Sequence, residues 1–122
     1  MDTRRKTRER LEYWYSVLQT IILSRQNPCT GLIPASVAVT SHGDYRDAWV
    51  RDNVYSIYCV FGLALAFRRL DDVDGRAYEL EHSVIKCMRG LLFCMMRQAP
   101  KVEVFKNTQS IDQALHAKCV VV

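Results

Sequence analysis

The spacing of apolar residues along the chain predicts three helices. Over residues 8–25 apolar positions recur every three or four residues, as expected of a helix with one buried face. A second helix is predicted over about 51–68 and a third over about 76–98. Asn27 and Pro28 are expected to stop the first helix and Pro100 the third. No segment shows the alternation typical of a strand, so the sequence predicts an all-α protein.

The middle helix has an unusual composition, because no charged residue occurs between Val54 and Phe67. A helix that is apolar on every side is expected to be buried on every side. This run is shorter than the ~20 residues that cross a bilayer, so a membrane span is disfavoured. Three helices alone cannot enclose the middle one. We therefore expect the chain to be a piece of a larger helical assembly or to pack against a partner.

Charge is concentrated at the beginning of the chain. The 122 residues carry a formal net charge of +4, and residues 1–10 hold much of the excess. The remainder is nearly neutral, which disfavours nucleic acid as a partner. These ten residues are expected to form a basic arm that is either a solvated tail or the start of a helix. Contact with a partner or a membrane surface is the alternative. The basic residues are Arg4, Arg5, Lys6, Arg8 and Arg10.

No metal or cofactor site is predicted. The histidines are scattered, and no pair of cysteines has the spacing of a zinc ligand pair. The acidic turn at 71–75 fails as a calcium loop, because Leu70 would have to supply its first ligand. No glycine-rich phosphate loop is present. The cysteines are expected to be reduced thiols inside a cell; they are Cys29, Cys59, Cys87, Cys94 and Cys119.

The candidate binding site lies where a polar loop meets the second helix, at Trp49, Arg51 and Asp52. The indole could stack on a sugar ring while the charged groups bind hydroxyls. In the competing interpretation, Trp49 belongs to the core and Arg51 with Asp52 forms a salt-bridged helix start. Asp52 and Asn53 are expected to accept hydrogen bonds from free backbone N–H groups of the first turn.

Catalysis by this chain alone is not expected. Glycoside hydrolysis needs two carboxyl groups on opposite sides of the scissile bond. Asp44 and Asp47 lie in the same loop as the candidate site, and no second segment offers a partner for Asp52.

Several segments resemble one known family. Residues 26–36, 47–55, 78–82 and 86–92 are similar to the N-terminal region of the phosphorylase kinase regulatory subunits alpha and beta, and the resemblance covers roughly residues 10–118. Residues 49–53 look alpha-like, whereas residues 68–72 and 79–82 look more beta-like, so the type stays open.

The resemblance implies a fold. That region of the family is similar to glucoamylase-type glycoside hydrolases, which are (α/α)₆ barrels. This chain would supply about the first quarter of such a barrel, with residues 54–67 as an inner helix and 76–98 as an outer one. Residues 1–10 would be the basic arm, 11–118 the barrel fragment and 119–122 a divergent tail. Trp49, Arg51 and Asp52 match the Trp-x-Arg-Asp motif with which these enzymes bind sugar.

The resemblance also implies a function. The family regulates, without catalysis of its own, the kinase that activates glycogen phosphorylase. Implied partners are the phosphorylase kinase catalytic subunit, the other regulatory subunits, calmodulin through regions absent from this chain, and a glucan at a vestigial pocket. Two alternatives remain: a fragment of a glucoamylase-type hydrolase, and a free-standing helical interaction domain.

The last four residues, Cys119 to Val122, formally fit the pattern for prenylation of Cys119. A terminal Val is outside the usual choices, and the resemblance to the family ends just before the pattern. We therefore expect an accidental match and a cytoplasmic chain. Peripheral association with the cytoplasmic face of the cell membrane is the alternative.

Overall fold

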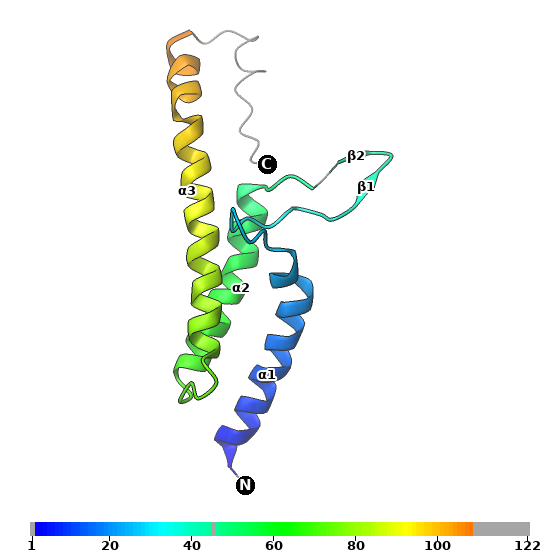
Figure 1. Ribbon diagram of the computed structural model, residues 1–122, viewed down its shortest axis with the longest axis vertical. Helices are drawn as coiled ribbons and strands as arrows, with labels where there is room; N and C mark the ends of the chain where they lie inside the picture. The colour runs from blue at the N-terminus through cyan, green and yellow to red at the C-terminus, as the bar shows by residue number, and fades with distance from the viewer. Residues whose placement is uncertain (1, 45, 109–122) are drawn as a thin grey trace.

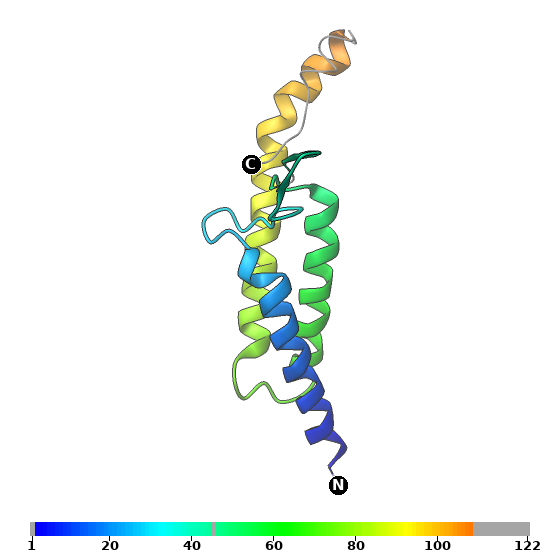
Figure 2. The ribbon, with the colours of Figure 1, turned by 90° about the vertical axis from the view of Figure 1, so that its right-hand side faces the viewer.

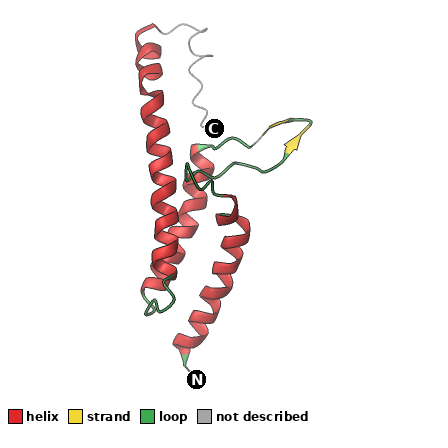
Figure 3. Ribbon diagram, in the orientation of Figure 1, coloured by secondary structure: helices red, strands yellow, loops and turns green. Residues whose placement is uncertain are grey.

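The computed structural model describes residues 2–44 and 46–108 of the chain, and within them the fold is almost entirely helical (Figures 1 and 3). Three α-helices carry the structure, and a short 3₁₀ turn and a two-stranded hairpin separate the first two. The elements in order are α1 (Thr3–Ile21), η1 (Leu23–Arg25), β1 (Val39–Thr40), β2 (Gly43–Asp44), α2 (Val50–Arg68) and α3 (Arg76–Thr108).

Helices α2 and α3 run side by side in opposite directions, and α1 packs against α2 (Figure 1). One face of each helix supplies the core, and the loop after η1 adds two residues to it. The buried apolar residues are Tyr15, Leu32, Ile33, Ile57, Val60, Leu63, Ala64, Phe67, Ala77, Leu80, Val84, Cys87 and Leu91.

The basic residues at the beginning of the chain are the first turns of α1. The Asp2 side chain caps the helix by accepting a 2.9 Å hydrogen bond from the Arg4 backbone N–H. The Arg8 guanidinium donates to the Asp71 carbonyl at 2.9 Å, and Arg4 lies 3.6 Å from the Asp71 carboxylate. The helix-start interpretation therefore describes this segment, and its positive charge is partly balanced by the acidic turn before α3.

A polar cluster ties α1 to α3 beside the core. The Tyr15 hydroxyl donates to the Glu79 carboxylate at 2.5 Å, and the Gln19 amide donates to both of these groups. The Arg76 guanidinium lies 4.0 Å from the centre of the Tyr15 ring, and Phe67 packs edge-on against that ring. Burial raises the pKa of the Tyr15 phenol, as does its hydrogen bond to Glu79.

The bounds of α2 match the predicted helix to within one residue, but its burial is one-sided. Ile57, Val60 and Phe67 face the core, whereas the opposite side is open: Tyr58 is 64% exposed and Phe61 41% exposed. The described residues do not cover that side. A helix without a polar face thus presents apolar side chains to solvent, as expected of a piece of a larger assembly.

The prediction that Pro100 ends the third helix was wrong, because α3 continues through it to Thr108. Proline removes one backbone hydrogen bond and crowds the carbonyl four residues earlier, but a helix can absorb this by bending. Figure 2 shows such a bend in the upper part of α3. The residues after Pro100 include Lys101, Glu103 and Lys106, which favour a helix, and none is Gly or Pro, so the helix resumes.

The structure also contains strands that were not predicted. β1 and β2 pair antiparallel, with Val39 opposite Asp44 and Thr40 opposite Gly43, and Gly43 has a φ of 139°. Two residues per strand are too few to produce a visible alternation in the sequence. The hairpin projects away from the helices (Figure 1).

The loop between η1 and β1 lies directly on the backbone of α3. A Cβ added to Gly31, whose φ is 74°, would come within 2.2 Å of the Lys86 carbonyl oxygen. A Cβ added to Gly90 would lie 2.2 Å from the Thr30 carbonyl oxygen. The Gln26 amide joins the two elements by donating to the Gly31 and Ser83 carbonyls, each at 2.9 Å. Glycine at both positions permits this close approach.

Candidate functional site

The predicted site lies at the N-terminus of α2, where the loop from the β-hairpin enters the helix. A 2.9 Å hydrogen bond from the Ala35 N–H to the Asp47 carbonyl joins the two arms of the loop. Trp49 is the N-cap residue of α2, with an extended backbone and no capping bond from its side chain. The three predicted residues thus follow one another through the cap and first turn of a single helix.

All three predicted side chains face solvent. Trp49 is 53% exposed, which excludes it from the core of the described residues. The Arg51 guanidinium lies 3.8 Å from the Asp52 carboxylate, and the two side chains are 81% and 41% exposed. An ion pair so open adds little stability. Arg51 and Asp52 are therefore brought together, while Trp49 precedes them in the chain as an uncovered aromatic side chain.

The prediction that Asn53 caps the first turn of α2 was wrong. Its side chain instead binds the backbone of Ile33 and of Trp49. Asn53 is fully buried. Its carboxamide accepts a 2.8 Å hydrogen bond from the Ile33 N–H, and donates to the Ile33 carbonyl at 2.8 Å and to the Trp49 carbonyl at 2.9 Å. The Cys87 thiol also points at Asn53 Oδ1, 3.5 Å away. Asn53 therefore links the backbone of Trp49, the first residue of the candidate site, to the buried loop residue Ile33.

Two cavities of the described residues lie elsewhere, and neither is lined by Trp49, Arg51 or Asp52. One, of about 550 Å³, is an apolar groove between the exposed edges of α2 and α3, lined by Tyr58, Phe61 and Met88 among others. The other, of about 500 Å³, lies between the loop at 29–32 and α3 and is lined by cationic side chains. Sequence reasoning had singled out neither cavity.

The cysteines within the described residues are free thiols. Cys29 and Cys59 are exposed, Cys94 is half-buried, and Cys87 is fully buried in the core. Burial raises the pKa of the Cys87 thiol to about 11. Cys119, the candidate for prenylation, lies outside the described residues.

Over the described ranges, no group of three His, Cys, Asp or Glu side chains is placed to hold a metal ion. None of the helices in the same ranges is both long enough and apolar enough to cross a membrane.

Comparison with known families shows which family the chain belongs to. The model of the glycosyl hydrolases family 15 matches residues 8–121, nearly the whole chain. The chain belongs to glycosyl hydrolase family 15. Its predominantly helical structure agrees with a partial α/α barrel of the glucoamylase type.

Curated relatives of this family 15 chain are regulatory subunits. Over 97% of the chain it is 53% identical to the phosphorylase b kinase regulatory subunit alpha, skeletal muscle isoform, of Oryctolagus cuniculus, and 52% identical to the liver isoform of Takifugu rubripes. It is 42% identical over 92% of its length to the probable regulatory subunit beta of Drosophila melanogaster. The chain spans 9% of each of the two alpha subunits and 10% of the beta subunit.

Proposed function

We propose that this family 15 chain is the N-terminal part of a non-catalytic regulatory subunit of a phosphorylase kinase. The observation that carries the proposal is identity of about half over almost the entire chain to subunits that bear that name. The higher identity to the alpha subunits than to the beta subunit favours the alpha type. In this role the chain assembles with the kinase catalytic subunit and the other regulatory subunits.

The exposed faces of α2 and α3 support the view that the barrel continues beyond these helices. The apolar groove between the helices, with Phe61 and Met88 in its walls, is a surface that further helices of a barrel would cover. In this arrangement α2 is an inner helix and α3 an outer one. Calmodulin binds regions that the chain does not include.

The junction at Trp49, Arg51 and Asp52 is proposed to be a vestigial glucan site. An exposed indole beside a guanidinium and a carboxylate provides a stacking face with adjacent hydrogen-bonding groups. Hydrolysis at this site would require a second carboxyl group on the other side of the sugar. Asp47 lies in the loop directly before α2, close to Asp52 in the chain, so it does not offer a carboxyl group on the other side of the sugar. The site is therefore proposed to bind sugar and not to cleave it.

The experiment for the regulatory role is co-expression of the tagged chain with the phosphorylase kinase catalytic subunit and the remaining regulatory subunits. We expect the chain to copurify with the complex and to alter its activity towards glycogen phosphorylase. Release of glucose from maltotriose by the purified chain would instead favour the hydrolase alternative. If the chain neither copurifies with the complex nor releases glucose, and is a stable monomer, a free-standing helical domain would be favoured.

A place in this complex locates the chain in the cytoplasm. Prenylation of Cys119 is the route by which it would reach a membrane, and a single lipid gives only marginal attachment. Intact mass of protein from eukaryotic cells is expected to show no prenyl increment. An increment that disappears in Cys119→Ser would establish membrane association instead.

A further inference from the structure

The cationic cavity between residues 29–32 and α3 has a composition unlike the rest of the surface. Its walls contain Lys86, Arg89 and Arg97 together with His82, and no Asp or Glu of residues 2–44 or 46–108 lines it. Its volume of about 500 Å³ lies in the range of ligand pockets. A pocket with positive walls and no internal counter-charge is suited to an anionic ligand.

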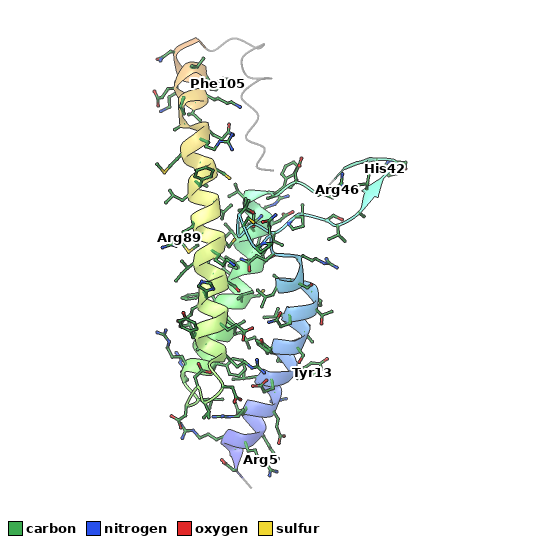
Figure 4. The ribbon with its side chains drawn as sticks, in the orientation of Figure 1. Arg5, Tyr13, His42, Arg46, Arg89 and Phe105 are labelled. Carbon is green, nitrogen blue, oxygen red and sulfur yellow. The ribbon has the colours of Figure 1, made fainter. Side chains whose placement is uncertain are left out.

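Among the described residues, the cations of this cavity have no ion-pair partner, in contrast to those nearby. Arg68 donates to the Glu81 carboxylate at 2.6 Å, and Arg76 lies 3.4 Å from the Glu12 carboxylate. By contrast, Lys86, Arg89 and Arg97 form no ion pair with any residue that the structure describes. Figure 4 shows Arg89 projecting away from the helix pair. These charges are therefore available to a ligand.

The cations form a line along one face of α3. Lys86, Arg89, Phe93 and Arg97 follow one another at steps of three or four residues, which places them on one side of the helix. The two ends of this row, Lys86 and Arg97, are eleven positions apart, which corresponds to about 16 Å at ~1.5 Å per residue. A single small anion cannot reach both ends. Five residues of extended peptide, at ~3.3 Å each, span the same length.

An aromatic ring divides the row. Phe93 is 62% exposed and lies between Arg89 and Arg97, and the Arg97 guanidinium approaches its ring centre to 5.9 Å. An exposed ring flanked by cations offers apolar contact to a side chain whose neighbours on both sides are negative. This pattern fits a peptide better than a free phosphate or a sugar.

We propose that this cavity binds an extended peptide segment that carries phosphorylated or acidic side chains on either side of an apolar residue. The anionic groups pair with Lys86 and Arg89 at one end and with Arg97 at the other, and the apolar residue packs on Phe93. The loop at 29–32 forms the opposite wall. The proposal does not depend on the regulatory role or on the glucan site.

The test uses thiol footprinting of the complete chain. The probe is a synthetic peptide with two phosphoserines four positions apart and a leucine midway between them, so that all three side chains lie on one face of the extended segment. Cys29 is exposed and lines the cavity, whereas Cys59 is exposed on α2 and does not. The peptide is expected to slow alkylation of Cys29 by iodoacetamide at least fivefold and to leave Cys59 unchanged. Equal rates with and without peptide would overturn the proposal.

Matched charge variants identify the binding groups. Arg89→Gln with Arg97→Gln should weaken binding of the fluorescent peptide at least thirtyfold, because each lost charge-assisted contact changes affinity by about tenfold. Arg5→Gln with Arg10→Gln removes the same net charge from the far end of the molecule, where Figure 4 labels Arg5, and should change affinity less than twofold. An equal loss in both double variants would show non-specific attraction and refute the site.

Further ligands separate the alternatives. The peptide with aspartates in place of phosphoserines should bind, but more weakly, and the serine peptide should not protect Cys29. Equal protection by inorganic phosphate would identify a small-anion site and contradict a peptide site. Tighter binding of a single-stranded oligonucleotide than of the phosphopeptide would also contradict it.

Discussion

The side chain of Asn53 pairs with the backbone of Ile33 through two hydrogen bonds of 2.8 Å each, so an amide in α2 satisfies both polar groups of one buried loop residue. The arrangement resembles the pairing of two strands, with a side chain in place of the second backbone. It fixes the loop that carries Leu32 and Ile33 into the core against the helix that begins at the candidate glucan site.

Replacement of Asn53 should therefore be costly. In Asn53→Ala the Ile33 N–H and carbonyl both lose their partner inside the protein, which we expect to destabilise the fold by about 3 kcal/mol. Urea unfolding followed by circular dichroism measures this. The control is Ser24→Ala, which removes an exposed hydrogen bond to the Thr20 carbonyl and should change stability by less than about 0.5 kcal/mol. Similar losses in the two variants would show that the Asn53 pairing is not formed in solution.

Two helical glycines provide a matched test of the contact between the loop and α3. Gly90→Ala places a methyl group 2.2 Å from the Thr30 carbonyl oxygen and should cost about 1–3 kcal/mol. Gly62→Ala meets no atom within 4 Å and should stabilise α2 by about 0.5–1 kcal/mol. Thermal unfolding of both variants gives the comparison. A stabilising Gly90→Ala would mean that the loop does not rest on α3.

Pro100 is expected to weaken the last turns of α3. Pro100→Ala restores a backbone hydrogen bond and removes a steric clash, each part of a helix-interior cost of about 3 kcal/mol. Amide hydrogen exchange should slow between residues 97 and 107 and stay unchanged at Val60 in the core. Unchanged exchange in the terminal turns would show that neighbouring residues already compensate for the proline.

The buried thiol of Cys87 should react slowly. Its pKa of about 11 leaves about a hundredfold less thiolate at pH 8 than the usual value of 9.0, and burial blocks the reagent as well. Iodoacetamide followed by mass spectrometry should modify exposed Cys59 at least a hundred times faster than Cys87. Comparable rates would contradict a closed core.

The same pKa shift makes stability depend on pH. The pKa of Cys87 is higher in the folded protein than in the unfolded chain. The neutral buried thiol therefore makes its full contribution to the free energy of unfolding below pH 9. This contribution, about 2–3 kcal/mol, is lost as pH rises to about 11. Cys87→Ala should remove this part of the decline in the free energy of unfolding between pH 9 and 11. An identical decline in the variant would assign the effect to other groups.

The glucan site is tested most directly in a polypeptide of the relatives' full length. Arg51→Ala and Asp52→Asn should each weaken binding of maltotriose about tenfold or more, because each removes a charge-assisted hydrogen bond of roughly 1.5–3 kcal/mol. Isothermal titration calorimetry measures the affinity. Arg25→Ala, in η1, serves as the control and should leave it unchanged. Equal affinity in all variants would make the motif a structural helix start.

The helices were predictable where local pattern decides structure. The bounds of α2 follow from an apolar run bracketed by polar residues, and they were predicted to within one residue. The far end of α3 was missed because the rule for proline concerns one lost bond, while the helix is stabilised by the turns on either side of Pro100. The β-hairpin is too short to leave a periodic signal.

The residues of the candidate site could be found from their types, but their surroundings could not. Trp49, Arg51 and Asp52 stood out because an aromatic and two charges adjoin a helix start. The role of Asn53 depends on Ile33, twenty residues earlier in the chain, and no local pattern reveals that pairing. The cationic cavity was missed for the same reason, since its second wall comes from a loop far from α3 in sequence.

The segment from Asn27 to Ile33 has a consequence for the order in which the chain folds. Helices α2 and α3 are joined by a short turn, so their pairing closes only a small loop and can form early. The segment contacts α2 through Asn53 and α3 through Gly90, and so has no complete binding surface until both helices are paired. We expect its docking to follow the transition state. The segment then governs how long the native structure lasts before it opens, and has little influence on how fast that structure forms.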